Sequence, residues 1–160
     1  MRVLIAFLAL TVLSGAFKLA GEDEGISESQ VHKFLDNWEA NAITRNVDGN
    51  LALLAEDVII EVRFPTEDGY KYGQIPIEYY KQVVRRNSEQ TTQHYYTRDN
   101  KEINISRDKE EAIIVAIVVE GKMRDGVEIK STIKVTEEMT LRLINRKLKI
   151  VRLVTSYWPE

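Results

Sequence analysis

Residues 127–143 read VEIKSTIKVTEEMTLRL, and apolar and polar side chains alternate along almost the whole stretch. Successive side chains of a β-strand point to opposite faces of the sheet, so this alternation predicts one long strand with a core face and a water face. The core face is apolar except at Ser131 and Glu137, whereas the other face is polar throughout. The stretch therefore predicts a half-buried sheet with a carboxylate on its buried side.

Stretches on either side of these residues follow the same two-residue period. We expect strands at Gln93–Ile105, Glu111–Arg124 and Lys147–Tyr157. The dipeptide Asp125-Gly126 precedes the quoted stretch, and Asp-Gly is a strong signal for a tight turn between antiparallel strands. The second half of the chain therefore predicts an antiparallel meander.

The first half of the chain has a helical period instead. Apolar residues from Val31 to Ala42 recur every three or four positions and follow the capping-box pattern Ser27-x-x-Gln30. The sequence further predicts a short helix at Leu51–Ala55, a strand at Val58–Phe64, a loop at Thr66–Gln74 and a helix from Pro76 to about Asn87. Helices that precede a meander indicate an α+β fold, and the sequence has no repeats or linkers, so we expect a single domain over residues 21–160.

The composition excludes several classes of protein. The chain has 160 residues, 44% of them hydrophobic, which is enough for one packed core. Its 22 Lys and Arg against 25 Asp and Glu give a net charge of −3, without the basic excess typical of nucleic-acid binders. There is no cysteine, which excludes disulfides, thiolate metal sites and cysteine nucleophiles. The two histidines have no closely spaced acidic partners, so we expect no metal site and no cofactor.

The N-terminus has the pattern of a secretory signal peptide. Arg2 precedes an apolar run over Val3–Leu13, and small residues follow it, so cleavage is expected after Ala16 or Ala20. The run is shorter than the roughly 20 residues of a membrane-spanning helix. The motif Leu-Ser-Gly-Ala resembles a bacterial lipoprotein processing box with Ala16 in place of the lipidated cysteine. We expect residues 1–20 to be removed and the protein to be periplasmic or secreted, without membrane insertion afterwards; a buried core helix is the alternative.

Glu137 is the most informative polar residue, because the period places it on the buried face. A buried carboxylate is costly unless it is paired or protonated. Burial would raise the pKa of this carboxyl towards the range useful for general acid–base chemistry. Two structural alternatives remain open: a bulge that turns the side chain outwards, or an internal ion pair with Arg98 or Arg152.

The stretch Ala112–Val119 is apolar on both of its faces. One face has Ala112, Ile114, Ala116 and Val118, and the other has Ile113, Val115, Ile117 and Val119. A single layer of helices covers only one face of a sheet, so the other face needs a cover of its own. We expect a homodimer formed through the outer face of the sheet, with cover from within the chain as the alternative.

The order of elements and several local motifs resemble the nuclear transport factor two-like superfamily and its SnoaL-like members. The residues that carry the resemblance are NVDGNLALLAEDV at 46–58, Gly73 and Ile77 before the third helix, and Thr92–Tyr95 at the start of the long strand. The resemblance covers about Ser27–Trp158. It implies three N-terminal helices packed on a strongly curved, mainly antiparallel sheet, a cystatin-like cone that encloses an apolar pocket, usually in a dimer.

The resemblance also implies which positions would carry chemistry. In the ketosteroid isomerase-like branch, a tyrosine on the first helix and an acid on the fifth strand hold an oxyanion, and an aspartate at the end of the first strand moves the proton. Here Trp38 takes the tyrosine position, Glu137 the acid position and Val62 the base position. An indole has no proton to give up usefully and valine is no base, so the comparison argues against steroid-type isomerase activity.

The candidate site residues follow from these patterns. We predict catalytic roles for Glu137 and His94, and ligand contacts from Trp38, Val62, Phe64, Tyr80, Tyr96 and Met139. The first hypothesis is an exported domain that binds a small apolar or aromatic molecule or a partner, without catalysis. The alternative is a cofactor-independent isomerase, dehydratase or hydrolase that uses Glu137 with His94 or Trp38. A structural interaction module is a third class.

Overall fold

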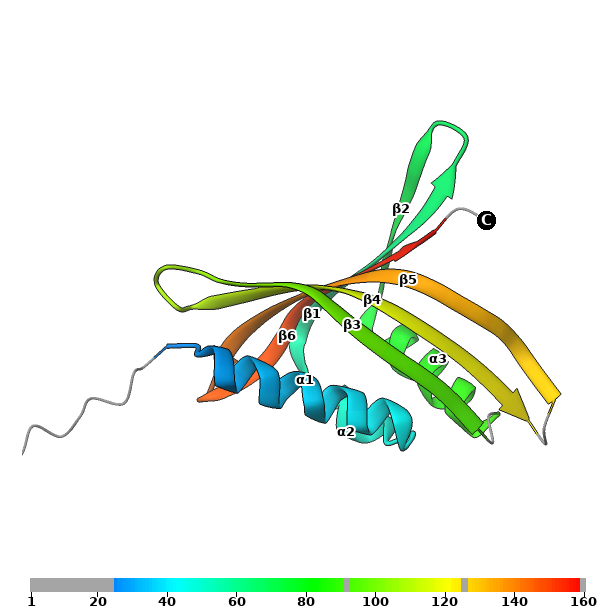
Figure 1. Ribbon diagram of the computed structural model, residues 1–160, viewed down its shortest axis with the longest axis horizontal. Helices are drawn as coiled ribbons and strands as arrows, with labels where there is room; N and C mark the ends of the chain where they lie inside the picture. Colours follow the sequence, from blue (N-terminus) through cyan, green and yellow to red (C-terminus); the bar gives the residue numbers. More distant parts are fainter. Residues whose placement is uncertain (1–24, 91–92, 125–126, 159–160) are drawn as a thin grey trace, which may run out of the picture.

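The computed structural model describes residues 25–90, 93–124 and 127–158 (Figure 1). Its helices are α1 (Glu28–Ile43), α2 (Val47–Leu51) and α3 (Ile77–Glu89). Its strands are β1 (Leu54–Thr66), β2 (Gly69–Ile75), β3 (Gln93–Ile105), β4 (Glu111–Arg124), β5 (Val127–Ile144) and β6 (Lys147–Tyr157). The predicted α+β class is confirmed, with the helices in the first half and a long meander in the second.

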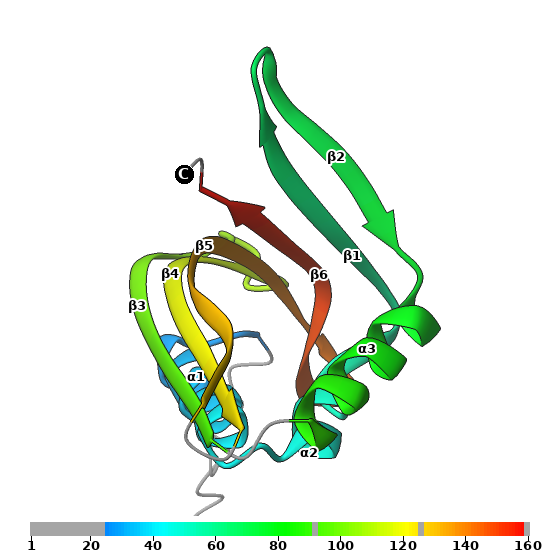
Figure 2. The ribbon, with the colours of Figure 1, turned by 90° about the vertical axis from the view of Figure 1, so that its right-hand side faces the viewer.

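The six strands form one curved sheet in the order β2-β1-β6-β5-β4-β3. Neighbouring strands are antiparallel except β1 and β6, which pair in parallel. The helices lie on the concave side of the sheet, and the β1–β2 hairpin extends away from the rest of the molecule (Figure 2). In the described part of the chain, the convex face therefore has no helical layer.

Helix α1 begins at the capping box that the sequence predicts. The backbone N–H of Gln30 donates to the Ser27 hydroxyl oxygen (3.3 Å), and the Ser27 N–H donates to the Gln30 side-chain oxygen (2.7 Å). These bonds satisfy backbone donors that a helix leaves unpaired at its start. The buried stripe of α1 packs in the hydrophobic core and consists of Val31, Phe34, Leu35, Trp38 and Asn41.

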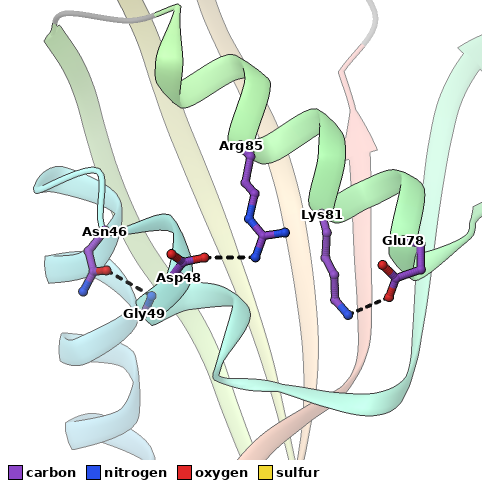
Figure 3. Close-up of polar contacts among 6 residues, drawn as sticks. All are labelled: Asn46, Asp48, Gly49, Glu78, Lys81 and Arg85. Atoms are coloured by element: carbon purple, nitrogen blue, oxygen red, sulfur yellow. Dashed lines mark hydrogen bonds and ion pairs between the residues drawn. The ribbon is translucent and has the colours of Figure 1, made fainter.

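Helix α2 lies four residues earlier than expected. Asn46 caps it, because its side-chain oxygen accepts a hydrogen bond from the Gly49 N–H at 3.0 Å (Figure 3). The chain leaves the helix after Leu51, and Leu54 then pairs with Ile150 of β6. Strand β1 therefore starts before Val58, the first residue of the predicted strand.

Strand β2 replaces the loop that the sequence predicts after β1. Its residues pair with β1 from Ile60–Ile75 to Thr66–Gly69. The strand is almost entirely exposed, so its side chains follow no alternating pattern of burial. Without a buried face, the two-residue hydrophobic period that identifies strands is missing.

The core consists of rows of side chains that cross the concave face of the sheet. Two adjacent rows are entirely apolar: Ile103, Ile114, Met139, Leu153 and Ile60 in one, and Ile105, Ala112, Leu141, Ile150 and Leu54 in the other. The residues of both rows belong to the core or pack against it. The next row contains Asn100, Ala116, Glu137, Thr155 and Val62, so polar groups enter there. The row that contains Glu137 is therefore the one at which polar side chains enter the concave face, next to two rows that are apolar throughout.

Candidate functional site

A cavity of about 340 Å³ lies between the concave face of the sheet and the three helices. Most of its wall is apolar or aromatic, and residues from α1, α2, α3 and all six strands contribute to it. The side chains that decide its chemistry are Trp38, Tyr80, Tyr96, Glu120 and Glu137. A cavity of this size and lining is typical of small-molecule sites.

Helix α3 forms one side of the cavity. It has no fully buried residue, but Tyr80, Val83 and Val84 line the cavity. Its apolar face is therefore turned to the cavity rather than to a packed core. An ion pair between Arg85 of α3 and Asp48 of α2, at 3.0 Å, links the two helices (Figure 3).

The structure brings five of the predicted site residues to this cavity: Trp38, Val62, Tyr80, Tyr96 and Glu137. They come from α1, β1, α3, β3 and β5 respectively. No single window of sequence contains them, so their proximity is a consequence of the fold.

Two predicted pocket residues lie elsewhere. Phe64 is 49% exposed and stacks on Tyr157 with ring centroids 5.1 Å apart, because β1 runs past the cavity into the projecting hairpin (Figure 2). Met139 is fully buried in the apolar core and does not line the cavity. The two-residue period predicts which face of the sheet a side chain occupies. It does not predict whether that part of the face borders the cavity. The side chain of His94 lies outside the described residues.

Glu137 is ion-paired with Arg98 of β3. The Nη1 of Arg98 donates to Oε1 of Glu137, so the predicted alternative of an ion pair with Arg98 is confirmed. Arg152 instead bonds two other carboxylates, those of Glu61 and Glu138, both at 2.7 Å. The carboxylate on the buried face is therefore compensated by a charge from within the sheet.

The two members of this ion pair face the cavity unequally. The Arg98 side chain is 0% exposed and is not among the cavity-lining residues, whereas Glu137 lines the cavity and keeps 11% exposure. The small residue Ala116 lies opposite Glu137 on the intervening strand β4, which leaves room for the guanidinium. Burial, the largest single cause, lowers the pKa of Arg98, but the charge of Glu137, the influence of Tyr96 and the hydrogen bonds with both residues together raise it, so the guanidinium stays charged.

Two phenols lie close to the same carboxylate. Burial raises the pKa of Tyr80 above its ordinary value of 10.0, and the charge of Glu137 raises it further. Burial and Glu137 also raise the pKa of Tyr96, although the charge of Arg98 and hydrogen bonds with Arg98 and Trp38 act in the opposite direction. Both hydroxyls are therefore protonated at neutral pH.

The raised pKa values of Tyr80 and Tyr96 predict a loss of stability in alkali. Below about pH 10 both phenols are protonated in the folded and the unfolded chain. Above that pH the unfolded chain releases protons that the folded chain retains, so the free energy of unfolding falls as pH rises towards the folded-state pKa values. Urea unfolding between pH 9 and pH 11 measures this slope. We expect a shallower slope in Tyr80→Phe than in the control Tyr79→Phe, whose ring is exposed; equal slopes would contradict the prediction.

The sequence reasoning missed two charged residues that line the cavity, Glu120 and Arg45. Glu120 shares the parity of Ala116 and Val118 in β4, so the two-residue period does place it on the concave face. Arg45 follows α1 in a left-handed backbone conformation (φ 56°) and belongs to no periodic segment. No sequence pattern identifies such a position.

The described residues form no metal site and no membrane-spanning helix. Within residues 25–90, 93–124 and 127–158, no group of three His, Cys, Asp or Glu side chains is arranged to hold a metal ion. None of the helices in these ranges is long and apolar enough to cross a membrane.

The sequence matches no protein-family model and no curated protein. Several solved structures are similar to the structure of this chain. A ketosteroid isomerase-like protein from Erwinia carotovora atroseptica has a TM-score of 0.60 and 13% identity, over 82% of this chain and 96% of that one. A protein of unknown function with a cystatin-like fold from Nostoc punctiforme has a TM-score of 0.54 and 14% identity, over 82% and 91%. An NTF-2-like protein of unknown function from Shewanella oneidensis has a TM-score of 0.56 and 15% identity, over 80% and 97%.

These similarities establish the fold. The chain has the curved-sheet, cystatin-like fold that the sequence resemblance predicts, and these solved structures share it. A fold of this kind carries unrelated functions, so function has to be argued from the site.

Proposed function

We propose that this protein is an exported binding domain whose cavity holds a small, mainly apolar molecule or the apolar part of a partner. The observation that carries the proposal is the cavity of about 340 Å³, with Trp38, Val62, Val84 and Tyr96 in its wall. Protein interiors are close-packed and leave few voids larger than a water molecule. Space of this size beside a fully packed core is therefore better explained by a bound molecule than by poor packing.

The enzymatic alternative, an isomerase, dehydratase or hydrolase, needs a group that takes a proton from the substrate. Val62 occupies the position where the resemblance implies that base, and valine cannot serve as one. Glu137 is held by Arg98, and the Trp38 indole only donates hydrogen bonds. These features favour binding without catalysis.

Two further parts of the proposal concern location and assembly. The apolar run at residues 3–13 supports export to the periplasm or the medium. The convex face of β4 supports a homodimer, because Ile113 is 40% exposed there and Val115, Ile117 and Val119 are only half-buried. Native mass spectrometry of the protein isolated from its own export compartment measures both the number of subunits and the mass of any retained molecule.

Filling the cavity is expected to abolish binding without unfolding the protein. In Val84→Trp, an indole from α3 would occupy space that the wild-type cavity leaves open. We expect the affinity for N-phenyl-1-naphthylamine, an uncharged fluorescent probe, to fall by about tenfold or more, because a close-packed site does not accept added volume. Fluorescence titration measures the affinity.

The matched control for this experiment is Val127→Trp, the same substitution at a position that is 66% exposed. It is expected to leave probe binding unchanged. Equal affinities of wild type, Val84→Trp and Val127→Trp would place the probe outside the cavity, and no binding by any of them would overturn the proposed function.

A further inference from the structure

The Glu137 carboxylate in the cavity wall can accept a hydrogen bond from a bound molecule, and this indicates the chemistry of that molecule. We infer that this molecule presents a hydrogen-bond-donating hydroxyl or amino group to Glu137, and that carboxylates and phosphates with the same apolar body are rejected. The inference rests on the proposed binding function and specifies its ligand class.

The first step is the unequal exposure of the buried ion pair. Glu137 lines the cavity, whereas the Arg98 side chain is 0% exposed and does not line it. An ion-paired carboxylate accepts hydrogen bonds and has no proton to donate. A molecule in the cavity therefore meets the acceptor of this pair and not its donor.

The second step is the electric field at the neighbouring phenol. Burial is the largest cause of the raised pKa of Tyr80, and the carboxylates of Glu137 and Glu120, both in the wall, raise it further. Surroundings that oppose a phenolate at this place also oppose a ligand carboxylate or phosphate beside it. Negative charge is thus disfavoured beside Tyr80 and Glu137.

The third step concerns Arg45, the cation among the lining residues of the described chain. Arg45 is exposed after the end of α1, where it also lines a shallow surface groove with Asp48 and Glu89. Its side chain is therefore open to solvent rather than enclosed with the ligand. An exposed charge of this kind contributes little to selecting an anion.

The rest of the wall determines the body of the molecule. Trp38 and Tyr96 supply flat aromatic surface, and valines of α3 and of the sheet supply aliphatic surface. Apolar walls with a few convergent polar groups bind ligands that have one polar end. The class that fits is a small aromatic or alicyclic alcohol, phenol or amine.

Three probes with one skeleton test the inference on the full mature chain: 2-naphthol, 2-methoxynaphthalene and 2-naphthoate. The first donates a hydrogen bond, the second has nearly the same shape without the donor, and the third is an anion at neutral pH. Isothermal titration calorimetry at pH 7 is expected to show 2-naphthol binding about tenfold or more tightly than either of the others, as expected for a hydrogen bond to a charged acceptor.

A double variant removes the acceptor without leaving a buried charge. In Arg98→Met/Glu137→Leu, the preference for 2-naphthol over 2-methoxynaphthalene is expected to disappear. The matched control is Arg142→Met/Glu111→Leu, which removes an ion pair that does not line the cavity and is expected to keep the preference.

The other outcomes separate this inference from the proposed function. Tightest binding of 2-naphthoate, or equal binding of 2-naphthol and 2-methoxynaphthalene to the wild type, would overturn the inference and leave the binding function standing. A preference that survives in Arg98→Met/Glu137→Leu would also overturn it. Failure of all three probes to bind would overturn both.

Discussion

Replacing Arg98 by methionine is expected to lower the free energy of unfolding by about 3–5 kcal/mol. The substitution keeps much of the apolar volume of the side chain but removes the charge that compensates Glu137. The remaining carboxylate would lie in a site where the Arg98 side chain is 0% exposed and Glu137 only 11%. An isolated buried charge is far more costly than either a complete pair or no pair. Urea unfolding at pH 7, followed by circular dichroism, measures the loss.

Two comparisons separate this effect from a general loss of surface charge. Arg142→Met removes a partner of Glu111 from an ion pair whose arginine is 58% exposed, and should cost no more than about 1 kcal/mol. The double variant Arg98→Met/Glu137→Leu should regain most of the stability that Arg98→Met loses, because no unpaired charge remains. If the double variant is as unstable as Arg98→Met, the cost comes from packing and the electrostatic account is wrong.

The sequence predicts the meander well because burial dictates it. The strands at Gln93–Ile105, Glu111–Arg124 and Lys147–Tyr157 agree with the structure to the residue. The alternation along Val127–Leu143 and the apolar run at Ala112–Val119 both reflect contact with the core. Strand β2 is missed for the opposite reason. It pairs with β1 through the backbone and is almost wholly exposed, so its sequence has no alternation of apolar and polar side chains that would predict a strand.

The candidate site is only partly predictable from the sequence. The two-residue period tells which face of the sheet a side chain occupies, but not whether it lies in the core, beside the cavity or in solvent. Glu137, Val62 and Met139 all lie on the concave face, but Glu137 and Val62 line the cavity whereas Met139 is fully buried in the core. Even the apolar row of Met139 is divided, because Ile60 and Leu153 line the cavity and Met139 does not. Which residues of one face border the cavity is a tertiary property, so neither the period nor residue type identifies them.

The pairing of Glu137 illustrates the same limit. The sequence shows that a carboxylate is buried and that Arg98 and Arg152 are possible partners. The choice depends on strand order, since β3 and β5 both flank β4 whereas Arg152 points to the convex face with Glu61 and Glu138. Strand order is set by the whole sheet and leaves no local signal. The inferred preference of the cavity for hydrogen-bond-donating ligands depends on the pairing of Glu137 with Arg98, so it can be argued from the structure but not from the sequence.

Replacing Met139 by alanine tests where the core ends and is expected to cost about 2–5 kcal/mol of unfolding free energy. Met139 is fully buried in the row with Ile114 and Leu153, so truncation leaves a new void among side chains that cannot collapse to fill it. Because Met139 does not line the cavity, we expect the affinity for N-phenyl-1-naphthylamine to stay within about twofold of the wild-type value, measured where the variant remains folded. Ile43→Ala, at a position that is 51% exposed, is the control and should change stability by about 0.5 kcal/mol or less. A small stability loss combined with a large loss of probe affinity would show instead that Met139 contacts the ligand and that the cavity extends further towards the core.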